Sequence, residues 1–142
     1  MLRPNLAFST LKGFLDTEYQ VLELGFTLHI GAPCTELQEW LCGYEINCWT
    51  FLTAWNPGAK QLPEAENRIR NQNLEKEIKE MGFRPYSGLA AIADASWPAE
   101  ESYWVPGLCP NLGLDLAAKY GQLAIVGAVP PFGIPSLFWV DL

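Results

Sequence analysis

Side chains that could hold a metal ion or attract a polyanion are scarce in this chain of 142 residues. It has one histidine, His29, and its four cysteines form no C-x-x-C pair, so we expect no metal site. Nine basic against sixteen acidic residues give a formal net charge of −7, and this charge would repel nucleic acid. A phosphate-binding loop and a recognisable nucleophile motif are also missing, and we expect no cofactor.

Long apolar runs are missing as well, since no window approaches the roughly 20 consecutive apolar residues that a membrane-spanning helix needs. The first five residues carry one cation and lead into no uninterrupted apolar core, unlike a signal peptide. We therefore expect a soluble, cytoplasmic protein with no membrane partner. In that setting the cysteines are predicted to be reduced thiols that serve as small buried hydrophobic side chains. They are Cys34, Cys42, Cys48 and Cys109.

The residues that are present favour a globular protein, with 49% hydrophobic and 18% charged side chains. A chain of this length fits one domain, predicted over 1–142, with a helix in the N-terminal segment 1–18 and a proline-rich C-terminal segment, 129–142. The order of the predicted elements indicates an α+β fold in one compact domain. We expect a mixed or largely antiparallel sheet of about five strands, with three to four helices.

Two stretches predict strands with a partly exposed surface. Residues 19–30 alternate apolar and polar positions, which is typical of a half-buried strand, with a possible break at Gly25. Residues 83–93 favour a strand and loop at the edge of the sheet, because Pro85 cannot donate to a ladder and Gly88 weakens a strand interior.

The chain between these stretches predicts a helix and then a central strand. The helix should begin at Thr35, because Thr35 and Gln38 match a capping box, and it should end near Gly43. Residues 46–55 are apolar on both faces and predict a strand that is covered on both sides. That strand ends abruptly in the polar turn Asn56-Pro57-Gly58.

Residues 64–81 predict the longest helix, and its buried face changes character along its length. The C-terminal half of this face is apolar: Leu74, Ile78 and Met81. Helical spacing toward the N-terminus reaches polar side chains instead: Arg70 or Asn71, and then Asn67. A buried polar group without a partner costs about 1–3 kcal/mol, so these side chains need partners. Either protein groups or a ligand must supply them.

The strand, turn and helix resemble those of a bacterial family known only as domain-of-unknown-function family 3293. The similarity runs from about residue 19 to residue 126 and depends on short motifs: Thr53-Ala54-Trp55-Asn56-Pro57, then Glu66-Asn67-Arg68 with Arg70 and Leu74, then Trp97 leading to Glu101-Ser102, and Tyr120-Gly121-Gln122 before the strand at 124–126. The family has no established activity, so the resemblance implies none.

Six polar residues lie at predicted strand ends or on the buried face of that helix: Asn56, Asn67, Arg70, Glu101, Ser102 and Gln122. The three amides and the arginine are the predicted ligand-binding residues. All six residues would converge on one small concave site in which Arg70 recognises a carboxylate or phosphate group. The structural alternative is that Arg70 pairs with Glu101 while Asn56 and Asn67 cap the turn, and both devices are common in proteins.

The sequence favours a binding module for a small anionic ligand or for a protein partner. A partner surface is predicted at Phe132, Phe138 and Trp139, because apolar residues gather near the C-terminus. The enzymatic alternative is a small hydrolase or transferase without a cofactor, using Glu101 and Ser102. His29 and Cys109 are further candidates for acid, base or nucleophile in that alternative.

Overall fold

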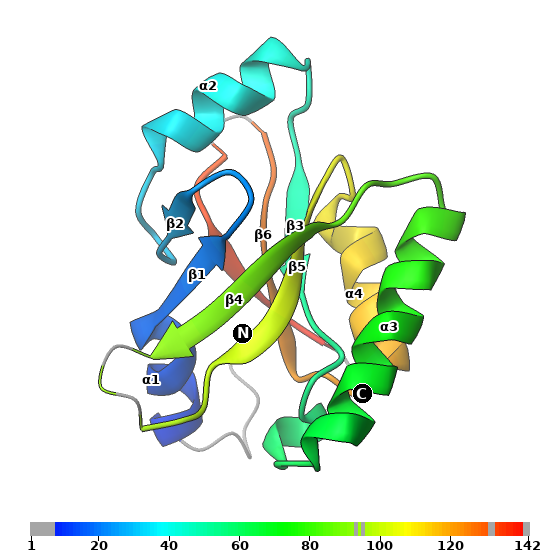
Figure 1. Ribbon diagram of the computed structural model, residues 1–142. Helices are drawn as coiled ribbons and strands as arrows, with labels where there is room; N and C mark the ends of the chain where they lie inside the picture. The colour runs from blue at the N-terminus through cyan, green and yellow to red at the C-terminus, as the bar shows by residue number, and fades with distance from the viewer. Residues whose placement is uncertain (1–7, 93, 95, 131–132, 141–142) are drawn as a thin grey trace.

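Seven strands form one sheet in the order β2-β1-β4-β5-β3-β6-β7, and every pairing is antiparallel (Figure 1). The computed structural model describes residues 8–92, 94, 96–130 and 133–140. Its strands are β1 (Thr17–Val21), β2 (Phe26–Leu28), β3 (Trp49–Leu52), β4 (Tyr86–Ile92), β5 (Glu100–Pro106), β6 (Ala124–Ala128) and β7 (Ser136–Trp139). Its helices are α1 (Phe8–Asp16), α2 (Thr35–Gly43), α3 (Glu64–Glu80) and α4 (Pro110–Lys119), with a short 3-10 turn, η1 (Pro57–Ala59).

The α+β class and the four helices are as predicted, but the sheet has more strands than the expected five. One reason is the stretch 19–30, which is a hairpin rather than one long strand. The chain turns at Gly25, whose φ of 73° suits glycine, and β2 then pairs back along β1. Because of this turn Leu22 is exposed, while Val21 and Phe26 face the core.

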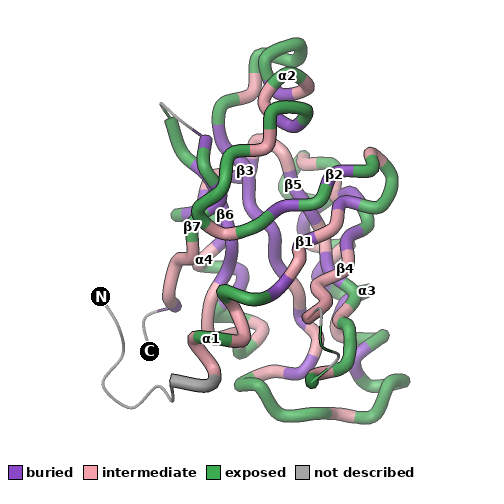
Figure 2. The backbone as a smooth tube through the Cα atoms, turned by 90° about the vertical axis from the view of Figure 1, so that its left-hand side faces the viewer, coloured by how far each residue is buried: buried purple, intermediate pink, exposed green. Residues whose placement is uncertain are grey.

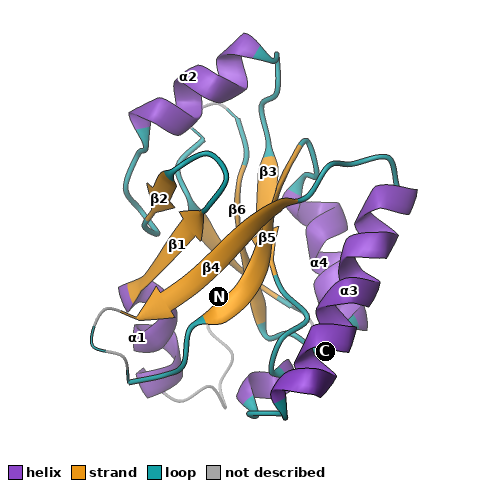
Figure 3. Ribbon diagram, in the orientation of Figure 1, coloured by secondary structure: helices purple, strands orange, loops and turns teal. Residues whose placement is uncertain are grey.

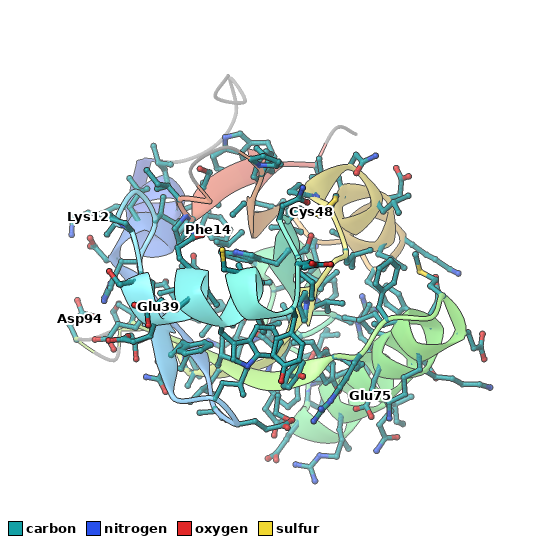
Figure 4. All side chains as sticks on the ribbon, turned by 90° about the horizontal axis from the view of Figure 1, so that it is seen from above. Lys12, Phe14, Glu39, Cys48, Glu75 and Asp94 are labelled. Atoms are coloured by element: carbon teal, nitrogen blue, oxygen red, sulfur yellow. A yellow bond between two sulfur atoms is a disulfide. The ribbon has the colours of Figure 1, made fainter. Side chains whose placement is uncertain are left out.

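The sheet curls until its two edges approach each other at the end nearest α2. There the Gly31 N–H, just beyond β2, donates to the Pro135 carbonyl just before β7, at 2.7 Å. The Gln38 side chain donates to Gly133 O at 2.8 Å and so ties α2 to the segment before β7. At the opposite end α1 lies between the sheet edges, and Phe14 packs edge-on against Trp139, with ring centroids 5.9 Å apart (Figure 4). The curled sheet therefore has an inner face, toward α1 and α2, and an outer face.

Helices α3 and α4 cover the outer face side by side (Figures 1 and 3). Leu74 and Ile78 of α3 and Ala117 of α4 are fully buried in this layer. Helix α4 approaches the sheet closely because Gly113 has no side chain to separate it from Thr50 of β3. A Cβ at this glycine would lie 2.6 Å from the Thr50 hydroxyl oxygen.

The inner face at the α2 end is filled by aromatic side chains. Trp104 of β5 lies at their centre and is fully buried, with Trp40 of α2 at 5.4 Å, Tyr86 at 5.7 Å and Trp49 at 6.2 Å between ring centroids. Burying side chains of this size contributes strongly to stability, since each removes roughly 150–250 Å² from water. Buried residues follow β3 and β6 almost continuously, and they alternate with partly exposed ones along β5 (Figure 2).

Two local predictions were wrong. Strand β4 is not at an edge, because it pairs with β1 on one side and β5 on the other. Gly88 is needed there because Phe51 packs over it, and a Cβ at Gly88 would lie 2.9 Å from the Phe51 ring. Helix α2 has no capping box, since Cys34 occupies the N-cap without a side-chain hydrogen bond. The Gln38 side chain contacts Gly133 instead.

The prediction of four reduced cysteines was also wrong, because Cys48 and Cys109 form a disulfide with Cα atoms 5.1 Å apart (Figure 4). The two residues are 61 positions apart in sequence, and the fold brings the start of β3 against the N-terminus of α4. Cys34 and Cys42 are free, and Cys42 is exposed rather than buried. None of the helices in the described residues is long and apolar enough to cross a membrane.

Candidate functional site

Strand β3 delivers the chain to a tight polar turn at Asn56. This residue adopts a left-handed conformation, with φ 48° and ψ 66°, which asparagine tolerates better than most side chains. It is only 5% exposed, so its polar atoms require partners inside the protein. Ala59, three residues later, also has a positive φ, of 60°. The turn is therefore a conformation that its surroundings must hold in place.

Asn67 of α3 supplies most of that support. Its side-chain oxygen accepts the Asn56 N–H at 2.8 Å, and its amide nitrogen donates to Asn56 Oδ1 at 2.7 Å and to Leu62 O at 3.2 Å. Asn56 Oδ1 also accepts the Leu62 N–H at 2.9 Å. Asn67 itself is 1% exposed. The two asparagines thus hold the loop between β3 and α3, which is the role that the structural alternative assigned to them as caps of the turn.

The next polar residues of α3 hold the strand end itself. Asn71 accepts the Ala54 N–H at 2.8 Å and donates to Glu101 O at 2.8 Å. Arg70 donates through Nε to Ala54 O at 2.8 Å and through a terminal nitrogen to Tyr120 O. Arg70 forms no ion pair with Glu101 among the described residues, and its hydrogen bonds are to backbone carbonyls. The polar half of the α3 stripe is therefore paired with the loop between β3 and α3, with the start of β5 and with the end of α4.

Glu101 and Ser102 point to opposite faces of the sheet, because successive strand residues alternate. The Glu101 side chain is exposed on the outer face beside α3. Ser102 is 2% exposed on the inner face, and its hydroxyl donates to the backbone carbonyl of Glu100 at 3.1 Å. The structure does not bring these two side chains together.

A cavity of about 410 Å³ lies on the inner face, at the end of the sheet nearest α1. Of the predicted residues, Asn56, Ser102 and Gln122 line it, whereas Asn67, Arg70 and Glu101 do not. Much of its wall is apolar and comes from five elements: Phe14 of α1, Phe51 of β3, Ile92 of β4, Val126 of β6 and Leu137 of β7. Gln122 donates to Trp55 O at 3.1 Å and so fixes the loop at the cavity rim.

Glu100 is the charged side chain at the polar end of this cavity, and the sequence analysis did not single it out. Its Oε2 accepts the Trp97 indole N–H at 2.7 Å and the Asn56 amide at 3.0 Å. Burial raises the pKa of the Glu100 carboxyl above its usual value, and the two donors partly oppose that rise. The available signal was strand alternation, since counting back two residues from the buried Ser102 gives Glu100 and not Glu101.

The remaining candidates lie away from the cavity or outside the described residues. His29 is exposed beyond β2, and Cys109 is held in the disulfide. Phe138 and Trp139 are half-buried and pack on the outer and inner faces of the sheet respectively, whereas Phe132 lies outside the described residues. Within the part of the chain that the structure describes, no three His, Cys, Asp or Glu residues gather as a metal site would require.

The sequence profile of the family described as "Protein of unknown function (DUF3293)" matches residues 52–125. This range includes just over half of the 142 residues, from the last residue of β3 to the second residue of β6. The resemblance expected from the motifs is thereby confirmed over a shorter range than 19–126. Comparisons with curated proteins and with solved structures gave no match.

Proposed function

We propose that this chain, which belongs to the DUF3293 family, is a binding domain for a small molecule that occupies the inner-face cavity. The observation that carries the proposal is the cavity itself, with about 410 Å³ of space, apolar walls and one hydrogen-bonded polar end at Glu100. Ligand sites in proteins have volumes of roughly 300–1,000 Å³ and combine apolar walls with a few fixed polar groups. The cavity has both properties and suits a ligand at the small end of that range.

The polar network around Asn56 has a supporting role in this proposal. Asn67 holds the backbone of the turn, which leaves the Asn56 amide nitrogen free to donate to Glu100. The same turn brings Asn56 and Ala59 to the cavity wall. Part of the predicted site is thus the scaffold that fixes the polar end of the cavity rather than its surface.

The alternatives find less support in this geometry. An anionic ligand bound by Arg70 would lie outside the cavity, because α3 covers the outer face and Arg70 is bound to backbone carbonyls. Phe138 and Trp139 pack against the domain and leave less apolar surface for a protein partner. A hydrolase or transferase that paired Glu101 with Ser102 would need side chains that here lie on opposite faces.

The test is binding of an uncharged fluorescent probe, N-phenyl-1-naphthylamine, to the purified protein, followed by fluorescence enhancement. Ala90 and Ala124 line the cavity from two strands, and Ala90→Leu or Ala124→Leu would fill part of it. Ala118→Leu is the matched control, because Ala118 is exposed on α4. We expect either cavity variant to weaken probe binding at least fivefold and the control to leave it unchanged. Binding by both cavity variants with the wild-type affinity would overturn the proposal, as would no binding by the wild type.

A further inference from the structure

We infer that the ligand of the inner-face cavity carries a protonated amine, which binds the Glu100 carboxylate. This inference rests on the proposed function and specifies the chemistry of the same site. A ligand of this class has a compact apolar body of hydrocarbon or aromatic character and one ammonium group. The apolar body lies along the walls near Phe51 and Ile92, and the ammonium group contacts Glu100.

The first observation is that Glu100 has no cationic partner among the residues that the structure describes. None of the described residues that line the cavity is a lysine, an arginine or a histidine. The ion pairs of the described residues lie elsewhere, and all but one of them are on α1, α3 or α4 or join those helices. A partly buried carboxylate without a counter-ion is costly, and proteins normally pair such groups. A cationic ligand group would supply the missing charge.

The second observation is the way in which the carboxylate is held. Both protein donors, Trp97 Nε1 and Asn56 Nδ2, are bound to the same oxygen, Oε2. An ionised carboxylate has two oxygens with about four acceptor positions, and Oε1 makes no hydrogen bond to another described residue. The protein therefore fixes the orientation of the group and leaves an acceptor available beside the cavity. A primary ammonium group, with three donors, can use that acceptor.

The third observation is the composition of the wall around the carboxylate. Tyr19, Phe51 and Trp97 line the same cavity, and aromatic faces attract cations as well as apolar groups. The Tyr19 hydroxyl is already used, since it donates to Phe14 O at 2.9 Å. An anionic ligand would find no basic side chain in the described lining, and it would meet the charge of Glu100. The wall thus favours a cation over an anion at this end.

The competing chemistry is a neutral ligand whose carbonyl accepts a hydrogen bond from protonated Glu100. A matched series separates the two, using 2-phenylethylamine, 2-phenylethanol and phenylacetate to displace N-phenyl-1-naphthylamine at pH 7.5. The amine and the alcohol share the same phenylethyl body and differ in the head group. We expect the amine to bind at least tenfold more tightly than the alcohol, and the carboxylate to bind most weakly.

Two variants assign the preference to one carboxylate. Glu100→Gln should reduce the amine-to-alcohol affinity ratio to below about twofold, because the variant loses the charge that favours the amine. Glu101→Gln, the same substitution at the neighbouring exposed residue, should keep the wild-type ratio. Circular dichroism and a thermal melt establish that each variant is folded, and the ratio measured with wild-type protein is decisive even if Glu100→Gln fails to fold.

The outcomes distinguish this inference from the proposed function. Equal or weaker binding of the amine relative to the alcohol would overturn the inference while the cavity remains a binding site. An undiminished amine preference in folded Glu100→Gln would also overturn it. Failure of the wild-type protein to bind the probe would refute the proposed function, and the inference with it.

Discussion

Replacing Asn67 with alanine should lower the free energy of unfolding by more than the loss of one hydrogen bond would. Asn67 is 1% exposed and makes three hydrogen bonds to the turn between β3 and α3. Truncation to alanine removes all three and leaves the buried N–H of Asn56 without its partner. It also leaves Leu62 O with one hydrogen bond fewer. The turn would then have to hold a left-handed residue with little side-chain support.

The expected loss can be estimated from these groups. An unsatisfied buried N–H costs about 1–3 kcal/mol, and each further hydrogen bond contributes about 0.5–1.5 kcal/mol net. Alanine is a better helix former than asparagine and returns roughly 0.5 kcal/mol. The free energy of unfolding should therefore fall by about 2–4 kcal/mol. For a domain of this size the melting temperature should fall by roughly 6–15 °C.

The matched control is Asn73→Ala, which makes the same substitution at an exposed position of α3. It should change the free energy of unfolding by less than about 0.5 kcal/mol, or stabilise slightly through helix propensity. Urea unfolding followed by tryptophan fluorescence measures both variants, and equal m-values justify comparing them. If Asn67→Ala matches Asn73→Ala within about 0.5 kcal/mol, the reasoning that the buried network supports the turn is refuted.

Three further predictions concern charge, the disulfide and helix packing. Because burial raises the pKa of Glu100, the folded state holds this proton more tightly than the unfolded state, whose pKa is near 4.5. The wild type should therefore lose stability relative to Glu100→Gln as the pH rises from about 4.5 to neutral. Urea unfolding of both proteins across this range measures the difference, and a difference in midpoint that does not change with pH would contradict the prediction. The Cys48–Cys109 bond closes a loop with a sequence separation of 61, so the Cys48→Ala/Cys109→Ala variant should lose up to about 4 kcal/mol, and its stability should not respond to dithiothreitol. Gly113→Ala should destabilise by about 1–3 kcal/mol because its methyl group meets the buried Thr50, and a melting temperature at or above that of the wild type would refute the close packing of α4.

The sequence predicts α3 and its polar stripe well because helical periodicity extends over seventeen residues. Asn67, Asn71, Leu74 and Ile78 are buried, as the spacing indicates. The prediction for Met81 was wrong, because this residue lies at the end of the helix and is 40% exposed. At one step of this face the spacing allowed either Arg70 or Asn71. Asn71 is the buried residue, and Arg70 is only half-buried. The period of a long helix therefore fixes which side chains face inward, although it does not identify their partners.

Strand register could not be predicted equally well, because a shift of one residue reverses the two faces. Glu101 was selected and Glu100 was not, although both are glutamates at the start of the same strand. Strand alternation places Glu100 on the same face as Ser102, but only its pairing with Ala90 of β4 shows that this face is the one that carries the cavity. The edge position predicted for β4 failed for a related reason, since Gly88 accommodates the Phe51 ring from a strand distant in sequence. Contacts of this kind are not encoded within the strand itself.

The matched range 52–125 divides the proposed site into two parts that different segments of the chain supply. Glu100 and both of its donors, Asn56 and Trp97, lie inside the range. The walls formed by α1 and β7, with Phe14 and Leu137, lie outside it. If Glu100 selects for an ammonium group, the residues that recognise the charge lie within the range that the family profile matches. Some of the residues that contact the apolar body of the ligand lie outside that range. Preference for a cation and preference for a particular apolar body are then separable properties of the same cavity.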